Sequence, residues 1–571
     1  MRGKMADPIG EARTAVEQSA LAMAESASAV AAGSRKKGPS IGPIRYNLEA
    51  FGVAILGAVL LKWFCLEAFQ IPTSSMQPTL MGSVEAGVYD RLLVDKLAPV
   101  FREPQRWDVT VFSYPLQKNQ NYVKRLVGLP GETLFIGGGN LYRVTTVNGA
   151  RHYEVLRKPD RIQREQWREV YPARLHLHED QKVLGGMLSA VPASAWSDAD
   201  GPGRLTVQLE PVASRVYRLS FRDDEDGGFV DRVWDGYPTG IAQEIRKLAG
   251  GQPAEIVPDA RIEATFTPER TIDELTLEVE VRRPDQKPMT FSMLVRGGQC
   301  QLVARSEDGR PPAESATKVC ELPAGVATTV AFAHVDDELI AWRNGDEFLR
   351  VDVSAFDCRS GCELPPRAEG ANADHCAVPQ LRLKGQGKVQ VDGLRICRDL
   401  HYTKRGDSFK HAQDLIEIPA NHYFMMGDNT LQSIDSRGWT SLRVGVLPDG
   451  TVVPPQNAAT DPSVHVLRGN KRVIAPTEPP DRDETPVIVT DRDMLAMIDE
   501  FGDVHALKAR ARVVDSNGKR QLFLEPSTSQ NGEKEWEPPE EWVPFVPREH
   551  IRGRALVIFW RWPFPRLSPI R

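Results

Sequence analysis

A hydroxyl-rich stretch follows the first apolar segment of the chain and offers a candidate nucleophile. It runs from Gln70 to Leu80 and contains the hydroxyl run Thr73–Ser75. Pro72 and Pro78 fix their own φ angles and bias the preceding residues toward extended geometry, so the stretch predicts a strand that enters a tight turn. Such a turn would hold the Ser75 hydroxyl on a rigid support. The same residues also suit a Ser/Thr-rich linker, and this stretch alone does not separate the two interpretations.

A candidate proton acceptor lies in the apolar run Asn121–Glu132, where Lys124 interrupts a β-branched pattern. A lysine in a strand most often faces solvent. To serve as a base it would have to be buried and neutral, because an ordinary pKa near 10.4 leaves it protonated at neutral pH. Burial beside Val123 and Leu126 would have to lower that pKa by roughly three units.

A third polar cluster, Met425–Gly438, lies some 300 residues further on. Amide cleavage needs a nucleophile, a group that accepts its proton and later protonates the leaving amine, and donors for the developing oxyanion. A serine and a lysine can supply the first two roles without a histidine, and none of these three stretches contains one. Together the stretches point to a Ser/Lys hydrolase.

In this order the three stretches resemble the sequence boxes of bacterial type I signal peptidase, the membrane-bound Ser/Lys protease of the leader peptidase family. The matching residues are Ile71-Pro72-Thr73-Ser74-Ser75-Met76 with Pro78-Thr79-Leu80, then Tyr122 to Gly131, then Gly427-Asp428-Asn429 with Ser433, Asp435, Ser436 and Arg437. Asp90–Val94 and Val546–Ala555 resemble two further strands of that family. The resemblance does not cover the whole chain. Three residues depart from the family pattern, Tyr89, Asp95 and Thr430, and none of them lies on the implied proton path.

The resemblance implies a role for each matching residue. Ser75 would be the nucleophile and Lys124 the general base, while Thr73 and the backbone N–H of Ser75 would bind the oxyanion. The implied supporting roles are Ser433 holding the lysine amine, Asp435 forming an ion pair with Arg437 and Arg125, and Gly427 leaving room for the lysine. Ile71, Pro72, Tyr122 and Val123 are the candidate substrate-binding residues.

The resemblance also implies a substrate class. Signal peptides present an extended segment with small side chains, and strand edges near Ile71–Thr73 and Asn121–Val123 could pair with such a segment. We therefore expect a signal peptidase I that needs no cofactor and no metal. Two alternatives remain open. One is a related Ser/Lys protease that cuts itself or one dedicated partner, and the other is a non-catalytic surface-binding protein.

The apolar span Leu48–Phe69 precedes these residues and bears on where in the cell the hydrolase acts. It is long enough to cross a bilayer, but Glu49, Lys62 and Glu67 interrupt it, so it could be a membrane anchor, a cleaved signal peptide or a buried helix. We favour an uncleaved anchor. Lys and Arg outnumber Asp and Glu by seven to four in residues 1–45, which predicts a cytoplasmic N-terminus and an extracytoplasmic catalytic domain at the cytoplasmic (inner) membrane, in contact with lipid.

The rest of the chain reads as mainly β. Its net charge of −6 gives no reason to expect a nucleic-acid partner, and 43 prolines with 45 glycines suggest many turns. The resemblance predicts a catalytic core of the β-barrel or sheet type found in signal peptidases. The predicted domains are a cytoplasmic tail (1–46), a transmembrane anchor (47–69), a catalytic core in two parts (70–155 and 406–442), an inserted domain (156–405), a second insertion (443–540), and a closing strand with a tail (541–571).

Alternating runs in the inserted domain predict a β-sandwich, which resembles concanavalin- or laminin-G-type modules. Asn344-Gly345 predicts a hairpin turn. Carbohydrate binding by Trp196, Trp234 and Trp342 is one interpretation, and aromatic packing in a scaffold is the favoured one.

Cysteines and histidines of the same domain give further expectations. Six cysteines predict at least one disulfide. The alternative interpretation is a zinc site at Cys358, Cys362 and His375-Cys376. For His176 and His178 we favour alternation on a strand over a metal pair. In the second insertion, Ala475–Pro486 predicts a linker and Arg492–Phe501 a helix.

Overall fold

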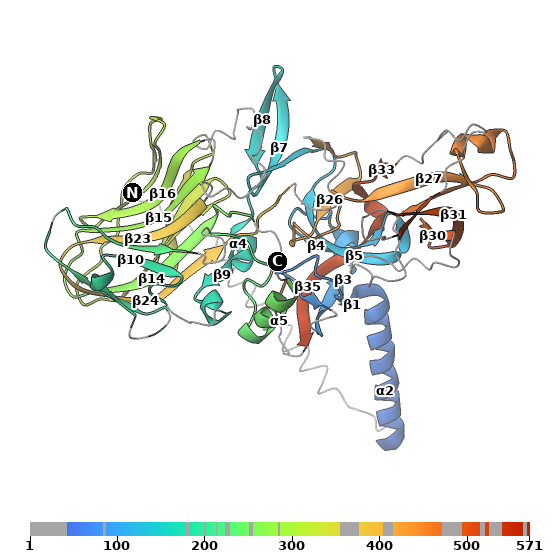
Figure 1. The fold of residues 1–571 in the computed structure, drawn as a ribbon. Coiled ribbons are helices and arrows are strands. Elements are labelled where there is room, and N and C mark those ends of the chain that lie inside the picture. The colour runs from blue at the N-terminus through green and yellow to red at the C-terminus, as the bar shows by residue number, and fades with distance from the viewer. Residues whose placement is uncertain are drawn as a thin grey trace, which may run out of the picture. The chain divides into compact units, whose positions relative to one another are not determined.

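The structure is a computed structural model, and it divides into two compact units, residues 1–64 and 65–571. The described residues are 43–83, 87–177, 183–198, 201, 203–212, 214–222, 229–249, 255–283, 286–354, 376–403, 415–470, 494–513, 520–524, 540–562 and 568–570. Within them the chain is mainly β, as predicted from the sequence (Figure 1).

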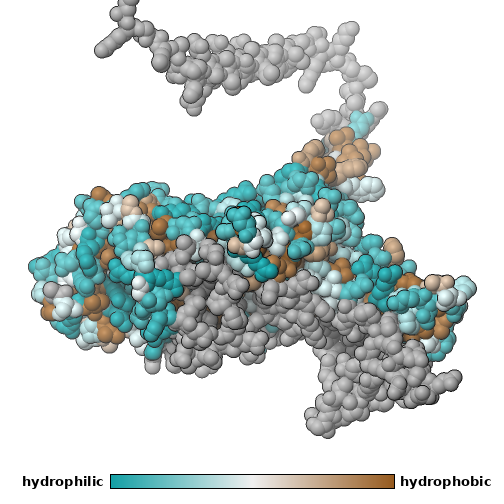
Figure 2. All heavy atoms as spheres, turned by 90° about the horizontal axis from the view of Figure 1, so that it is seen from above, coloured by the Kyte–Doolittle hydropathy of each residue, from teal (hydrophilic) through white to brown (hydrophobic). Residues whose placement is uncertain are grey.

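The apolar span forms α2 (Pro43–Leu60), which continues through one π-helical turn, η1 (Leu61–Cys65). Residues 47–65 have the length and the mean hydropathy, 1.8, of a segment that can cross a membrane. Hydrophobic residues, brown in Figure 2, gather on the described part of this helix. The predicted helix extended to Phe69, and this end is wrong. Residues 66–69 belong to strand β1 (Leu66–Gln70), because their backbone pairs with β3 instead of continuing the helix.

The sheet that follows brings together segments far apart in sequence. Its strands, in spatial order, are β1, β3 (Val88–Asp95), β35 (Ile551–Trp562), β4 (Val109–Tyr114), β5 (Gln117–Gly128), β26 (His422–Met426) and β34 (Phe545–Pro547), with β2 (Gly82–Ser83) and β36 (Ser568–Pro569) paired at the side. Neighbouring strands run antiparallel. The sheet is therefore complete only when chain segments before and after both inserted regions meet.

A smaller sheet packs beside it and contains β25 (Ile416–Glu417), β6 (Thr133–Gly137), β7 (Asn140–Val147) and β8 (Ala150–Val155). Its apolar residues share a core with the main sheet, in which Leu134 and Ile136 meet Phe424 and Met426. The short helix α3 (Ala98–Phe101) lies between β3 and β4 in the chain.

The inserted region forms the predicted β-sandwich, which Figure 1 shows as two layers of strands. One sheet contains β10 (Leu188–Val191), β13 (Tyr217–Phe221), β23 (Cys376–Lys384), β15 (Glu274–Arg283), β16 (Gln286–Arg296), β17 (Gln299–Ser306), β18 (Ala313–Glu314) and β19 (Lys318–Val319). The other contains β11 (Trp196–Ser197), β12 (Leu205–Leu209), β24 (Gly387–Arg398), β14 (Ala260–Pro268), β20 (Thr328–Val335), β21 (Glu338–Arg343), β22 (Asp346–Asp352) and β9 (Arg168–Tyr171). Inward residues of both sheets form one core, to which β15 contributes Leu277 and β14 contributes Phe266.

The local signals for this sandwich are confirmed. The hairpin turn falls between β21 and β22, where Asn344 and Gly345 have φ of 52° and 90°, as a tight hairpin with two left-handed residues requires. Helices α4 (Asp160–Gln166) and α5 (Thr239–Ala249) and the short 3₁₀ segments η2 (Ala173–Leu177) and η3 (Ala193–Ala195) connect the strands. Trp196 and Trp234 are buried and Trp342 is half-buried under the Arg261 guanidinium, which fits scaffold aromatics.

The second insertion is also β. It contains β27 (Thr440–Val446), β28 (Val452–Val453), η4 (Pro455–Ala459), β29 (His465–Asn470), β30 (Met494–Asp499), β31 (Val504–Val513), β32 (Arg520–Leu524) and β33 (Glu540–Trp542), and η5 (Arg548–His550) precedes β35. The predicted helix at Arg492–Phe501 is wrong. β30 pairs with β31 and buries Met497 in a core with Leu507, so strand pairing overrides the local helical propensity. The predicted linker lies outside the described residues.

Cysteine and histidine predictions have mixed outcomes. Cys300, Cys320 and Cys397 are buried free thiols, so no disulfide joins these three. Cys358, Cys362 and His375 lie outside the described residues, as does the side chain of Cys376. The predicted zinc site therefore also lies outside the described residues. The strand expected at His176 is wrong, because this residue lies in η2, and His178 is outside the described residues.

Candidate active site

Ser75 lies in the turn that follows β1. The chain leaves β1 at Gln70, and backbone bonds from Gln77 to Ser74 and from Leu80 to Met76 close the turn. The serine is 3% exposed, and its Oγ lies 3.4 Å from Thr73 Oγ1. The expected extended entry into a tight turn is thus present, with the strand ending at Gln70.

Lys124 lies in β5 and is buried, with 3% of its surface exposed. The solvent-facing interpretation of this lysine is therefore excluded. Its strand neighbour across the ladder is Thr110, and its Nζ lies 5.9 Å from the centre of the Tyr122 ring. On the other side of β5, Arg125 pairs with Met426, the last residue of β26, and Gly427 follows directly in the chain.

Gly427 makes the close approach at this site. A Cβ built on it would lie 2.1 Å from Ser433 Oγ and 2.3 Å from the backbone oxygen of Ser75. Any side chain here would displace one of the two serines. The three atoms nearest to this Cβ position all belong to Ser75 and Ser433, so these two serines occupy the space that a side chain at position 427 would need. Ser433 Oγ is buried and has no hydrogen-bond partner among the described residues.

Two buried ion pairs support the site, and one of them corrects the expected pairing. Asp435 accepts hydrogen bonds of 2.8 and 2.7 Å from Arg437 and of 2.9 Å from the Gly427 N–H. Arg125, which we expected to join this pair, instead donates bonds of 2.8 and 2.6 Å to Asp428. Successive strand residues point to opposite faces, so Arg125 turns away from the face that Lys124 occupies.

Charges around Asp435 explain its ionisation. Burial opposes its charged form, but the Arg437 guanidinium, the Gly427 N–H and the positive charge of Lys124 together hold the pKa of this carboxyl below its ordinary value. Arg437 is therefore the main positive partner of this buried carboxylate, and the Lys124 charge adds only a smaller contribution.

Further contacts that the sequence analysis did not assign hold the nucleophile turn. Asn429 donates its backbone N–H to the Ser75 carbonyl at 3.2 Å. Thr79 donates to the Asp428 carboxylate and accepts a 2.9 Å bond from Arg168 of the inserted region. Asp428, Asn429 and Thr79 stand inside the matched motifs, but the sequence alone does not separate Asp428 from Asp435 as the partner of Arg125. Arg168 has no comparable sequence signal.

The candidate substrate-binding residues border the same turn. Ile71 is buried in an apolar cluster against which Val123 packs, so the structure brings these two together. Pro72 is exposed. Tyr122 is half-buried and stacks on Tyr114 with ring centres 4.3 Å apart. β26 ends opposite Arg125, and the residues of β5 that precede Arg125 extend beyond it.

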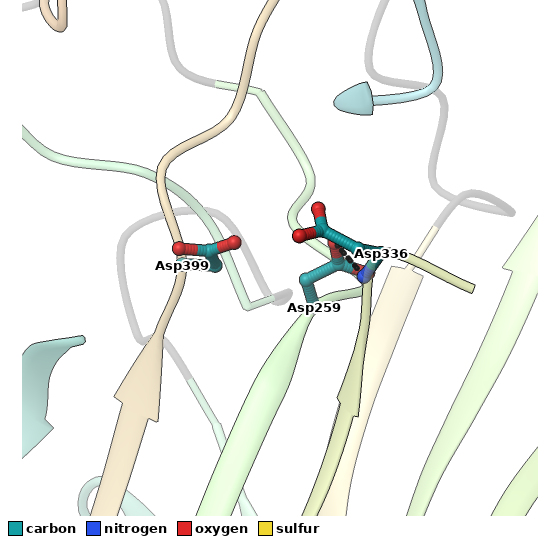
Figure 3. Close-up of side chains that lie close together, drawn as sticks. All are labelled: Asp259, Asp336 and Asp399. Carbon is teal, nitrogen blue, oxygen red and sulfur yellow. Dashed lines mark hydrogen bonds between the residues drawn. The ribbon is translucent and has the colours of Figure 1, made fainter. Parts of the chain in front are cut away.

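One group of carboxylates has the spacing of a metal site. Asp259, Asp336 and Asp399 come from three separate segments and converge in Figure 3, and each is buried. The Lys158 ammonium lies 2.6 Å from Asp336 and 2.8 Å from Asp399 and supplies a positive charge to the group. Burial, followed by the negative charges of Asp336 and Asp399, raises the pKa of Asp259 to about 8. This cluster connects the sandwich to the segment that leads back to the main sheet.

Comparison with known families agrees with this geometry. The family model described as "Signal peptidase, peptidase S26" matches residues 44–188 and 379–457, less than half of the chain. These ranges contain Ser75, Lys124 and Ser433. Two parts of the chain, separated by most of the β-sandwich, are thus similar to the peptidase S26 family.

Among characterised relatives the similarity is to type I signal peptidases in particular. The chain is 42% identical to signal peptidase I of Pseudomonas aeruginosa over 103 residues, 16% of this chain and 34% of the relative. It is 37% identical to probable signal peptidase I-1 of Synechocystis sp. over 107 residues, 18% of this chain and 52% of the relative. The chain thus spans about a third to a half of the length of these relatives.

Solved structures that share features with the chain include Caenorhabditis elegans galectin LEC-6, at 14% identity and a TM-score of 0.16, over 26% of this chain and 85% of the galectin. Another is the carbohydrate binding module CBM66 from Bacillus subtilis, at 6% identity and a TM-score of 0.20, over 37% of this chain and 94% of the module. Scores this low support no inference about ligands.

Proposed function

We propose that the protein is a membrane-bound serine endopeptidase that removes signal peptides from exported precursors, with Ser75 as nucleophile and Lys124 as general base. The observation that carries the proposal is that the buried Lys124 precedes Arg125, the β5 residue paired with Met426, while Gly427, which follows Met426, leaves the space of its missing side chain to Ser75 and Ser433. The similarity to type I signal peptidases supports the substrate class.

The first chemical step would be attack of Ser75 Oγ on the scissile carbonyl while Lys124 Nζ accepts the hydroxyl proton. A buried lysine suits this role because burial disfavours the ammonium form. The C–N bond then breaks, and the Lys124 ammonium returns the proton to the leaving amine. Water attacks the resulting ester of Ser75 while Lys124 accepts the proton of the water. The ester C–O bond then breaks, and the Lys124 ammonium returns the proton to Ser75 Oγ.

The negative oxygen that forms in each step needs donors. The Ser75 N–H and the Thr73 hydroxyl are the proposed pair, and the 3.4 Å separation of the two side-chain oxygens places Thr73 beside the nucleophile. In this role Ser433 would hold the lysine amine, since its buried Oγ has no other hydrogen-bond partner among the described residues. Asp435 and Arg437 would keep the adjacent charge balanced.

The proposed substrate pairs with β5 in an extended conformation. The part of β5 before Arg125 lies beyond the end of β26, and Val123 in this part packs against the apolar cluster that contains Ile71. We propose that α2 is the membrane anchor, with the N-terminus cytoplasmic and the catalytic part outside, because the helix has the required length and hydropathy. The proposed domain organisation follows the boundaries expected from the sequence, except that the anchor ends at Cys65, since β1 begins at Leu66.

The test is incubation of the full-length protein in detergent with several unrelated exported precursors, followed by N-terminal sequencing of the products. We expect one cut in each precursor, after small residues at the end of the signal peptide. Cleavage of only itself or of one dedicated partner would favour the related self-processing class instead. Intact precursors after prolonged incubation with folded protein would overturn the proposed activity.

A further inference from the structure

The inserted region contacts the turn that carries the candidate nucleophile through a polar route. Arg168 lies in β9, which pairs with β24 of the sandwich. Its Nη2 donates a 2.9 Å hydrogen bond to Thr79 Oγ1, four residues after Ser75. Because the Thr79 hydroxyl has one proton and that proton goes to Asp428, the direction of the two bonds is fixed. The sandwich is thus joined to the Asp428 carboxylate through Thr79.

A small movement of Asp428 would displace Ser75, because both neighbours of Asp428 in the chain approach that serine. It lies between Gly427, which has almost no clearance from Ser75 and Ser433, and Asn429, whose N–H donates to the Ser75 carbonyl. Arg125 binds both oxygens of the Asp428 carboxylate from β5, next to Lys124. Thr79 adds the third donor from the nucleophile's own turn. The carboxylate therefore links the turn of Ser75 to the strand of Lys124.

Arg168 lies in a setting that opposes its charge. Burial and the nearby guanidinium groups of Arg398 and Arg125 lower its pKa, while Tyr237 and Asp428 act in the other direction. Its Nε is buried with no hydrogen-bond partner among the described residues. The stem passes Gly236, where an added Cβ would lie 3.1 Å from Arg168 Cδ. The neighbouring backbone is thus shaped to admit this side chain.

A second, apolar contact holds the same turn. Met81 and Val88, which flank the start of the catalytic sheet, pack in one core with residues of the inserted region. The inserted residues of that core are Trp234, Tyr237, Ile241, Ala242 and Ile245. Met81 also donates its backbone N–H to Asp90 at 2.7 Å. The turn from Ser75 to Met81 is consequently held at its end by apolar packing and in its middle by Arg168.

The segment that presents these residues is itself anchored by buried charge. Asp235 binds Arg174 at 2.7 Å and Arg398 at 2.5 Å. Lys158 joins the sandwich turn at Asp336 to Asp399, which follows β24 in the chain. Arg168 therefore contacts Thr79 from a region of the inserted domain that several buried ion pairs hold together.

We propose that Arg168 is a positioning residue for the reaction, acting through Thr79 and Asp428, so that the inserted domain completes the active site. This inference rests on the proposed function. Arg168 touches neither Ser75 nor Lys124 in this role. It orients the Thr79 hydroxyl, which in turn fixes the carboxylate that links the two catalytic elements. The sandwich is accordingly required for turnover, independently of any ligand that it binds.

The test compares Arg168→Met, which keeps the length of the side chain and removes the donor, with Thr79→Val and the double variant. Arg164→Met, at an exposed position on α4, is the matched control. We expect Arg168→Met and Thr79→Val each to lower kcat at least tenfold with KM within threefold of the parent protein. The double variant should be no slower than Thr79→Val alone, and Thr79→Ser should restore turnover.

Hydrogen exchange gives a readout that does not depend on turnover. We expect the Asn429 amide, which bonds to Ser75, to exchange at least tenfold faster in Arg168→Met and unchanged in Arg164→Met. Wild-type kcat and unchanged exchange in Arg168→Met would overturn the inference, as would additive losses in the double variant. If the parent protein cleaves no precursor but the exchange effect is present, the proposed function fails while the link through Thr79 stands.

Discussion

Arg125 holds Asp428 across 303 residues of sequence with hydrogen bonds of 2.8 and 2.6 Å, and neither side chain has measurable exposure. The pair joins the strand that carries Lys124 to the loop whose next residue, Asn429, supports Ser75. The first inserted region lies between these two residues in the sequence. The geometry of the candidate site therefore depends on a contact that forms only when the catalytic segments have assembled.

Replacing Arg125 by Met should destabilise the protein by about 3–5 kcal/mol, because it leaves the Asp428 carboxylate buried without its main partner. Urea denaturation followed by tryptophan fluorescence measures the change. The control is Lys247→Met, which breaks the exposed pair with Glu244 at 2.8 Å and should cost less than about 1 kcal/mol. Equal effects of the two substitutions would show that the buried pair is not the support described.

Gly427→Ala should lower precursor cleavage about 100-fold, because the added methyl group would force Ser75 or Ser433 from its position by a large part of an ångström. The control is Gly240→Ala in α5, where a Cβ meets nothing within 4 Å. That variant should keep full activity. A Gly427→Ala protein with the parent rate would contradict the assignment of this close approach.

Thr73→Val should lower kcat by about 10²–10³-fold, the range found when one oxyanion donor is removed, and should leave KM nearly unchanged. Thr73→Ser retains the hydroxyl and should keep most of the rate. Steady-state kinetics on a peptide substrate separates the two parameters. A serine variant as slow as the valine variant would point to a packing role for Thr73 in place of a donor role.

The sequence was sufficient for the parts of this site that sit in short motifs. Ser75, Lys124 and Gly427 could be singled out because their residue types are restricted by chemistry or by space. The partner of Arg125 could not, since Asp428 and Asp435 both lie in the same turn. Only the alternation of side chains along β5, together with the register to β26, separates the two acids.

The other wrong predictions concern segments that pair as strands, which a hydropathy pattern does not reveal. Residues 66–69 are compatible with the end of an apolar helix, and Arg492–Phe501 with a short helix, yet β1 and β30 each find a partner strand. The general β-sandwich could be predicted because alternation and the Asn344-Gly345 turn are local signals. The contact of Arg168 with Thr79 joins two regions of the chain and leaves no trace in either one.

The free energy of unfolding should fall as pH rises from about 4 to about 8, because the buried Asp259 keeps a proton that the unfolded chain releases. Burial and the charges of Asp336 and Asp399 raise its pKa to about 8 from an ordinary value of 3.8, so the folded protein holds this proton more tightly than the unfolded chain. The contribution is complete below pH 3.8 and is lost as pH rises through about 8, at about 1.4 kcal/mol per pH unit in between. The Lys158 ammonium faces this cluster at Asp336 and Asp399, and the His334 ring nitrogen Nδ1 lies 3.3 Å from Asp259.

Asp259→Asn copies the protonated form and should remove this part of the pH dependence. Melting temperatures measured from pH 4 to 9 should be closest at the lowest pH and diverge steadily up to about pH 8, with the variant the more stable. Asp346→Asn, at an exposed position in β22, is the control and should follow the parent protein throughout. Parallel curves for all three proteins would contradict a raised pKa at Asp259.

Cleavage of one precursor by the full-length protein and its single-site variants tests the central claim most directly. The account predicts that Ser75→Ala and Lys124→Met abolish cleavage, with a loss of at least about 10²–10⁴-fold, while both variants keep the parent melting temperature within a few degrees. Ser74→Ala, which removes the neighbouring hydroxyl, should cleave at the parent rate. Undiminished cleavage by either the Ser75 or the Lys124 variant would contradict the Ser/Lys mechanism.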